Sequence, residues 1–481
     1  MSPLRRIQAS PRGLRARGAL ASGVAVVAFG WHAAPAAATK AVTEEEIHGG
    51  SEAEHATQLF RRSKGQEGAL IGAGALAGPA AGALRPHGMN LTTPLEDMTS
   101  EYIGRIGVGT DRDGGAQFNA RVVFDTGSTN LWVASVLCKL SPCSHEKASK
   151  FYDPKKSLTQ KAFVTKEGAP STSDIDIVFG TGELKGPLRV DTCRVGPMAV
   201  THQPFAMIRE MTGRVFESFP FEGILGLGFP SLSFGGITPF FEHVIDQKLL
   251  KNNEFSFYLN ADPTKPSAIL WGGVNKSLYT GPIRMFPVVQ PHYWAIELVD
   301  FRIGDKSYGD GGMKRLIFDS GTTFFTAPPM IYDEVVHRLK PAPCSTVESD
   351  SERYAPLVYV LRSASGKKYE LTLPQDIYML GDSSLGTSAV DEGHCKPAFM
   401  QLDVPRQYGP AMILGEVFMR SFFTVFSRGS GDVREARVGF ARARRGLAPG
   451  GLADPGGLQP AAEAEAEAAA FAERGGEAGD E

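Results

Sequence analysis

The sequence predicts an all-β molecule with a few short helices, built from two similar halves. Short alternating or apolar runs recur between residues 92 and 445, and clusters of Gly, Asn, Asp and Pro separate them. Long stretches of helical periodicity are scarce. A motif in the first half also returns in the second half in nearly the same form, as expected of an internal repeat.

Composition places the chain among ordinary folded proteins. It has 481 residues, of which 42% are hydrophobic, and this is enough for a large core and more than one domain. Lys and Arg number 50 against 53 Asp and Glu, a near balance that excludes a strongly basic nucleic-acid binder. Five cysteines exclude a disulfide-dense miniature scaffold but leave room for two bridges and one odd thiol.

The two ends differ from the middle. Residues 1–38 run from basic to apolar to small, the layout of a secretory signal peptide, with an uncleaved signal anchor as the alternative. Residues 39–90 hold one candidate helix and a Gly/Ala-rich run, which predicts a pro-segment and linker; a leader without inhibitory role is the alternative. Residues 446–481 form an acidic low-complexity tail.

Within the middle, individual elements follow from local pattern. Residues 102–108, 173–179 and 255–259 are short runs rich in Ile, Val, Phe and Tyr, and we expect a strand in each. Residues 238–250 and 330–339 are the best candidates for short helices.

The repeat carries the most information. The segment VVFDTGST at residues 122–129 is echoed by LIFDSGTT at residues 316–323, so that Asp125 and Asp319 lie 194 residues apart. About a hundred residues after each motif comes the tripeptide Ile-Leu-Gly, at 224–226 and at 413–415. The economical interpretation is two homologous lobes, each of which supplies one aspartate.

These residue types fit one kind of chemistry. An apolar strand delivers each carboxylate to a loop, a glycine lets the backbone approach its twin, and the flanking hydroxyls donate hydrogen bonds. Two facing aspartates share a proton, so Asp125 and Asp319 are the candidate general base and general acid for an attack by water. That chemistry requires no covalent intermediate, cofactor or metal. The residues expected to support the pair are Thr126, Gly127, Ser128, Ser320, Gly321 and Thr322.

Residues 94–443 resemble the pepsin-like aspartic proteases. FDTGSTNLWV at 124–133 and IFDSGTTFFTAP at 317–328 are similar to the two active-site loops of that family. The resemblance implies a bilobal fold with two pseudo-twofold-related β lobes, 91–272 and 273–445, and a cleft that binds an extended polypeptide. It also implies an aspartic endopeptidase, made as a zymogen whose pro-segment inhibits it, monomeric, and located in the secretory pathway or an acidic vesicle.

Residues 177–182, IVFGTG, resemble the family's flap, the hairpin that closes over substrate. Phe179 stands where most members have a tyrosine, whose phenol bonds an indole; Trp132 is at the matching indole position. The resemblance therefore implies apolar packing between flap and indole. The flap and cleft residues are Phe179, Gly180, Thr181 and Trp132. Phe179 and the secretory leader resemble the plasmepsin IX and X group of apicomplexan parasites, which process other secreted proteins.

The cysteines agree with the family. The resemblance implies bridges Cys138–Cys143 and Cys344–Cys395, and leaves Cys193 as a buried thiol. A metal site of Cys138, Cys143 and His145 is the alternative, although its spacing fits no common zinc pattern. Asn90 and Asn275 begin possible glycosylation triplets.

Two other functions compete with proteolysis. A catalytically silent peptide-binding or inhibitory module could use the same fold, but both aspartates and both motif glycines are intact. A serine or cysteine hydrolase lacks support, because the sequence contains no nucleophile elbow and no Cys–His arrangement.

Overall fold

The computed structural model describes residues 91–447 with short gaps. The gaps are 99–101, 140–142, 144–150, 166–167, 172–173, 180–181, 214–215, 217–220, 261, 263, 310–311, 382–392 and 405–406. The predicted signal peptide, the pro-segment and nearly all of the acidic tail lie outside the described residues, and so do Gly180, Thr181 and Asn90. Within the described residues, strands form sheets of 15, 8 and 3 members.

The first lobe, residues 102–246, carries one end of the largest sheet. Its strand order is β2-β3-β10-β4-β8-β7-β5, with β6 and β9 also paired to β7. The strands are β2 (Tyr102–Val108), β3 (Phe118–Asp125), β4 (Leu131–Ala134), β5 (Lys161–Ala162), β6 (Asp174–Phe179), β7 (Gly182–Val195), β8 (Met198–Ile208), β9 (Glu210–Thr212) and β10 (Gly223–Gly226). The strands expected at 102–108 and 173–179 are confirmed as β2 and β6.

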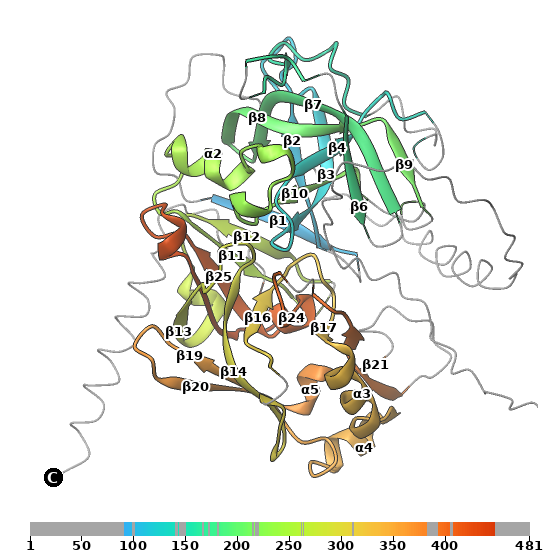
Figure 1. Ribbon diagram of the computed structural model, residues 1–481, viewed down its shortest axis with the longest axis vertical. Helices are drawn as coiled ribbons and strands as arrows, with labels where there is room; N and C mark the ends of the chain where they lie inside the picture. The colour runs from blue at the N-terminus through green and yellow to red at the C-terminus, as the bar shows by residue number, and fades with distance from the viewer. Residues whose placement is uncertain are drawn as a thin grey trace, which may run out of the picture.

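The other end of the 15-stranded sheet combines strands from both halves of the chain. We call these six strands the central sheet. Its order is β13-β26-β25-β11-β12-β1. The strands are β1 (Leu91–Asp97), β11 (Glu254–Tyr258), β12 (Ser267–Trp271), β13 (Tyr279–Pro287), β25 (Phe422–Ser427) and β26 (Arg437–Ala443). Figure 1 shows β11, β12 and β25 between the two lobes. The lobe boundary expected at residues 272 and 273 stays a prediction.

The second lobe, residues 295–419, contains the remaining two sheets. The larger has the order β20-β19-β14-β16-β24-β17-β23, with β15 paired to β14, and the smaller has the order β18-β22-β21. The strands are β14 (Ala295–Ile303), β15 (Lys306–Ser307), β16 (Arg315–Phe318), β17 (Phe325–Ala327), β18 (Ala342–Pro343), β19 (Leu357–Arg362), β20 (Lys368–Leu373), β21 (Met379–Gly381), β22 (His394–Pro397), β23 (Phe399–Gln401) and β24 (Ala411–Leu414).

The helices of the described residues are short. They are α2 (Phe240–Asp246), α3 (Pro329–Arg338), α4 (Cys344–Ser349), α5 (Gln375–Tyr378) and α7 (Glu416–Met419), with 3₁₀ turns η4 (Pro230–Leu232), η5 (Phe234–Gly236), η6 (Lys276–Leu278) and η9 (Val433–Glu435). Both helices expected from the sequence are confirmed, as α2 and α3. Within the described part of the chain, no helix has the length and apolar character to cross a membrane.

The sequence repeat is also a repeat of topology. In the first lobe, β10 pairs in parallel with β3 and antiparallel with β4, and Gly226 lies opposite Asp125. In the second lobe, β24 pairs in parallel with β16 and antiparallel with β17. Each aspartate therefore leaves the carboxyl end of a strand that is flanked by the strand of the Ile-Leu-Gly element. This predominantly β, two-lobed architecture agrees with the fold class that the sequence predicts.

Candidate active site

The first motif forms a tight loop around Asp125 at the end of β3. The Gly127 backbone N–H donates to Asp125 Oδ1 at 2.8 Å, and the Ser128 hydroxyl donates to Asp125 Oδ2. Asp125 and Ser128 are both buried. The loop therefore holds the carboxylate by two donors that come from within three residues of it.

The second motif repeats this geometry. The Gly321 backbone N–H donates to Asp319 Oδ1 at 2.8 Å, and the Thr322 hydroxyl donates to Asp319 Oδ2 at 2.7 Å. Asp319 is 3% exposed, so both aspartates of the two motifs are buried. Two loops of the same construction thus present one buried carboxyl group each.

A reciprocal set of hydrogen bonds joins the two loops. The Thr126 N–H donates to Ser320 Oγ at 3.1 Å, and the Ser320 N–H donates to Thr126 Oγ1 at 2.9 Å. The Thr126 hydroxyl donates to the Phe318 carbonyl at 3.0 Å, and the Ser320 hydroxyl donates to the Phe124 carbonyl at 2.7 Å. Each hydroxyl therefore both accepts from and donates to the other lobe.

Glycine at position 127 is a steric requirement of the approach. A Cβ atom placed on Gly127 would meet the Asp319 carboxyl atoms at 2.4–2.5 Å, well inside van der Waals contact. Only glycine allows the first loop to come this close to the second carboxyl group. The close approach of the two motifs therefore requires glycine at position 127.

The electrostatics of the pair follow from burial and proximity. Burial raises the pKa of Asp125 well above its ordinary value, the neighbouring Asp319 charge raises it further, and the hydrogen bond from Ser128 opposes them. Burial also raises the pKa of Asp319, while hydrogen bonds from Thr322, Gly321 and Asp125 lower it. The two carboxyl groups lie close together, since Gly127 donates to Asp125 and also abuts the Asp319 carboxyl atoms. Such a pair titrates as a unit and holds one proton between its members over a range of pH.

Tyr293 is a residue of this site that the sequence did not reveal. It lies two residues before β14 and is buried. Burial raises the pKa of its phenol, and the charges of Asp319 and Asp125 raise it further, which places Tyr293 within electrostatic reach of both carboxyl groups. No motif marks this tyrosine, because its position depends on where β14 enters the second lobe.

The expected flap is described only at its base. Strand β6 carries Ile175 and Ile177, and both pack in one buried cluster with Trp132. The backbone of Phe179 closes the hairpin against Gly182 in the pairing of β6 with β7. Trp132 therefore belongs to the same apolar cluster as the base of the expected flap, and packing of Phe179 on the indole stays a prediction. The roles of Phe179, Gly180 and Thr181 toward substrate stay predictions, since their side chains lie outside what the structure describes.

Both expected disulfides are present. Cys138 pairs with Cys143 across a separation of 5 residues, and Cys344 pairs with Cys395 across 51. Cys193 is free and buried, and burial raises the pKa of its thiol to about 12. The alternative metal site is wrong, because the first disulfide removes the two thiolates on which it depended. Among the described residues, no group of three or more metal-binding side chains gathers.

This fold and paired carboxyl site define a class of protein, and comparison with known proteins agrees. The family of eukaryotic aspartyl proteases matches residues 101–443, and the chain belongs to that family. The chain is 38% identical to Aspartic protease 3 of Toxoplasma gondii over 358 residues, a match that covers 73% of this chain and 51% of that protein. The chain thus spans about half the length of that relative.

Two further relatives match over most of their own length. Pepsin A of Sus scrofa is 32% identical over 72% of this chain and 83% of the pepsin. Cathepsin D of Chionodraco hamatus is 34% identical over 72% of this chain and 82% of the cathepsin. The resemblance to pepsin-like aspartic proteases is therefore confirmed.

Proposed function

We propose that this chain is an aspartic endopeptidase that hydrolyses peptide bonds with Asp125 and Asp319. The observation that carries the proposal is the pair of buried carboxyl groups, held by matching loops that are hydrogen-bonded to each other. Family membership supports it, since pepsin-like proteases bind polypeptide substrates in the cleft between their lobes. Thr126, Gly127, Ser128, Ser320, Gly321 and Thr322 are proposed as the supporting residues.

The chemistry follows from one shared proton. The ionised carboxylate of the pair accepts a proton from a water molecule, which attacks the scissile carbonyl carbon. The protonated partner donates its proton to the carbonyl oxygen, so that the tetrahedral intermediate is neutral. As the C–N bond breaks, the carboxyl group that received the water proton passes it to the leaving nitrogen, and a hydroxyl of the intermediate returns its proton to the other carboxylate, so that the pair again holds one proton. Each step uses a carboxyl group that the motif loops already hold in place.

The test is cleavage of an unfolded protein at pH ~5, where a shared proton is expected. We expect Asp319→Asn to lower kcat by at least about 100-fold, because the amide cannot accept the proton. Circular dichroism should show the same fold for both proteins. Full activity in Asp319→Asn would overturn the assignment. Absence of activity in the wild type after removal of residues 1–90 would instead favour the silent peptide-binding module.

We further propose that the protein is made as a secreted zymogen and resides in the secretory pathway or an acidic vesicle. The basic, apolar and small run of residues 1–38 supports this, and so do the two disulfides, which persist in oxidising compartments. Residues 39–90 are proposed to cover the site until acid weakens their contacts. A role in processing other secreted proteins is proposed from the resemblance of Phe179 and the secretory leader to the plasmepsin IX and X group.

Acidification of the purified precursor tests the zymogen proposal. We expect the chain to shorten, with a new N-terminus between residues 68 and 91, and mass spectrometry or N-terminal sequencing would locate it. Asp319→Asn treated identically is the control. Shortening in the wild type alone would indicate self-processing. A precursor that stays intact in acid and in a host extract would contradict the proposal.

A further inference from the structure

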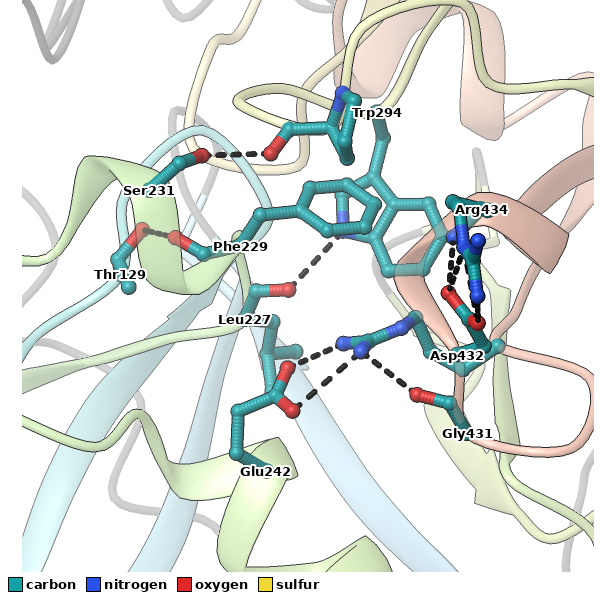
Figure 2. Close-up of polar contacts among 11 residues, drawn as sticks. Thr129, Leu227, Phe229, Ser231, Glu242, Trp294, Gly431, Asp432 and Arg434 are labelled. Atoms are coloured by element: carbon teal, nitrogen blue, oxygen red, sulfur yellow. Dashed lines mark hydrogen bonds and ion pairs between the residues drawn. The ribbon is translucent and has the colours of Figure 1, made fainter.

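Trp294 lies at the junction of the two lobes and is 1% exposed. Its indole Nε1–H donates to the Leu227 carbonyl at 2.9 Å, as the dashed line between the two labelled residues in Figure 2 shows. Trp294 directly precedes β14 of the second lobe, and Leu227 directly follows β10 of the first lobe. This hydrogen bond therefore crosses from one lobe to the other.

The same bond belongs to a continuous path between the two motifs. The Leu227 N–H donates to the carbonyl of Asp125 at 2.7 Å. At the other end, the Trp294 carbonyl accepts from the N–H of Phe318 at 3.0 Å, and Phe318 directly precedes Asp319. Three hydrogen bonds thus connect the backbone of one aspartate to the residue beside the other. Only the middle bond uses a side chain.

The indole has little freedom to move. Its ring packs against Phe229 of the first lobe, with ring centroids 4.5 Å apart. It also packs against Phe426 and Phe255 of the central sheet, with centroids 5.2 and 5.8 Å away. A close-packed interior of this kind fixes the direction of the N–H. The hydrogen bond to Leu227 is therefore set by the surrounding rings rather than by a mobile side chain.

The segment that carries Leu227 is itself held against the second half of the chain. Arg428, buried at the end of β25, pairs with Glu242 of α2 and lies over the Phe229 ring, with its Cζ 5.3 Å from the ring centroid. The Ser231 hydroxyl donates to the Pro291 carbonyl at 2.5 Å. Figure 2 shows the Phe229 ring beside the indole of Trp294. A displaced Leu227 would have to disturb all of these contacts.

The internal repeat has a counterpart to this contact. By strand register, Tyr102 occupies in the first lobe the place that Trp294 occupies in the second, and Glu416 follows its Ile-Leu-Gly element as Leu227 does. The Tyr102 N–H donates to Glu416 Oε1 at 3.2 Å, again from lobe to lobe. The crossing thus occurs at equivalent places in both halves, with different chemical groups.

We propose that Trp294 is a positioning residue for the paired carboxyl groups. Its indole N–H, through the Leu227 peptide, holds the Asp125 loop at a set distance from β16, which ends one residue before Asp319. The inference rests on the proposed function, because it concerns the geometry of that reaction. Misplacement of a reacting group by about 1 Å lowers a rate by about 100-fold. A hydrogen bond that sets the separation of the two motif loops can therefore affect the rate of the reaction.

Trp294→Phe removes the N–H and keeps an aromatic ring. Trp271→Phe is the matched control: Trp271 is equally buried, also packs on Phe255, and donates its Nε1–H to Thr93 Oγ1 at 2.9 Å, away from the path. We expect kcat to fall about 10- to 100-fold in Trp294→Phe with KM within about twofold of wild type, and the pH profile of kcat to narrow. Trp271→Phe should lose thermal stability and keep kcat and the pH profile.

Suppose that the wild type is active and that the two tryptophan variants have equal kcat values and equal pH profiles. That result would overturn the inference and leave the proposed function standing. An inactive wild type would overturn both. If Trp294→Phe does not fold, 3-benzothienylalanine can be introduced at position 294. Its side chain keeps the bicyclic shape of the indole and lacks the N–H. The same fall in kcat is expected there, and wild-type kcat in that protein would overturn the inference.

Discussion

At the residue scale, the local neighbours of each aspartate decide how easily it ionises. Burial and the second carboxyl group favour the neutral form of Asp125, whereas the donors at positions 127 and 128 favour the charged form. For Asp319, burial is opposed by donors at 321 and 322. The hydroxyl groups of the motifs therefore help to set the pH range in which the two aspartates hold one proton between them.

Removal of one of these hydroxyls should move the pH profile. Thr322→Val keeps the shape of the side chain and deletes the donor to Asp319 Oδ2. Because that hydrogen bond lowers the pKa of Asp319, its loss raises that pKa, and the acidic limb of the kcat profile moves to higher pH. The measurement is kcat against pH for both proteins.

Thr424→Val is the control for this prediction. Thr424 is also fully buried, and its hydroxyl donates to the Phe422 carbonyl in β25, not to either aspartate. Its profile should match the wild type in both limbs. An acidic limb that stays in place in Thr322→Val, or moves to lower pH, would contradict the account of the motif hydroxyls.

At the element scale, the two parallel pairs β3–β10 and β16–β24 make the site. Each pair delivers one aspartate at a strand end, and each is flanked by a third strand. The loops at 122–129 and 316–323 were foreseen because their hydrogen bonds are local, within three residues. Which strands lie beside them is a long-range property, so only the folded chain shows it.

The two disulfides should stabilise the fold unequally. Cys344–Cys395 closes a separation of 51 residues and Cys138–Cys143 one of 5. Since the entropy lost by the unfolded chain grows with the logarithm of loop length, the longer loop should contribute about 2 kcal/mol more to the free energy of unfolding. Denaturant unfolding of Cys344→Ser with Cys395→Ser, compared with Cys138→Ser with Cys143→Ser, measures the difference. Equal losses, or a larger loss from the shorter loop, would contradict it.

At the scale of the whole molecule, the lobes meet through buried polar contacts as well as through the central sheet. Arg428 is 2% exposed and donates to Glu242 and to the Gly431 carbonyl, the latter at 3.0 Å. A buried cation without partners is strongly unfavourable, so these acceptors are needed for the arginine to remain inside. The pair connects α2 of the first lobe to the end of β25.

Loss of one partner of this contact should destabilise the entire fold. We expect Glu242→Ala to lower the free energy of unfolding by roughly 3 kcal/mol, because it leaves the Arg428 charge buried and unpaired. Differential scanning calorimetry would measure it. Arg434→Ala is the control, since it breaks the pair of the exposed Arg434 with Asp432, also drawn in Figure 2, keeps the Asp432 cap of η9, and should leave the transition temperature nearly unchanged. Similar shifts in both variants would contradict the role of burial.

The sequence by itself determined the class of chemistry. Two Asp-Thr/Ser-Gly motifs after apolar strands predicted the paired carboxyl groups, and their spacing predicted two similar lobes. These features depend on residues near one another in the chain, whose conformation follows from local sterics and local hydrogen bonds. The same is true of β2, β6, α2 and α3, whose periodicity is strong enough to appear without context.

Only the tertiary structure decided how the two motifs are held together. A tryptophan is commonly buried, as Trp294 is, but its acceptor Leu227 lies 67 residues away in the other lobe. Arg428 belongs to a residue type that is mostly exposed, and only the fold places Glu242 beside it, 186 residues away. A hydrogen bond needs both partners within about 3 Å, and for residues so distant in the chain that proximity is produced by the packing of the lobes.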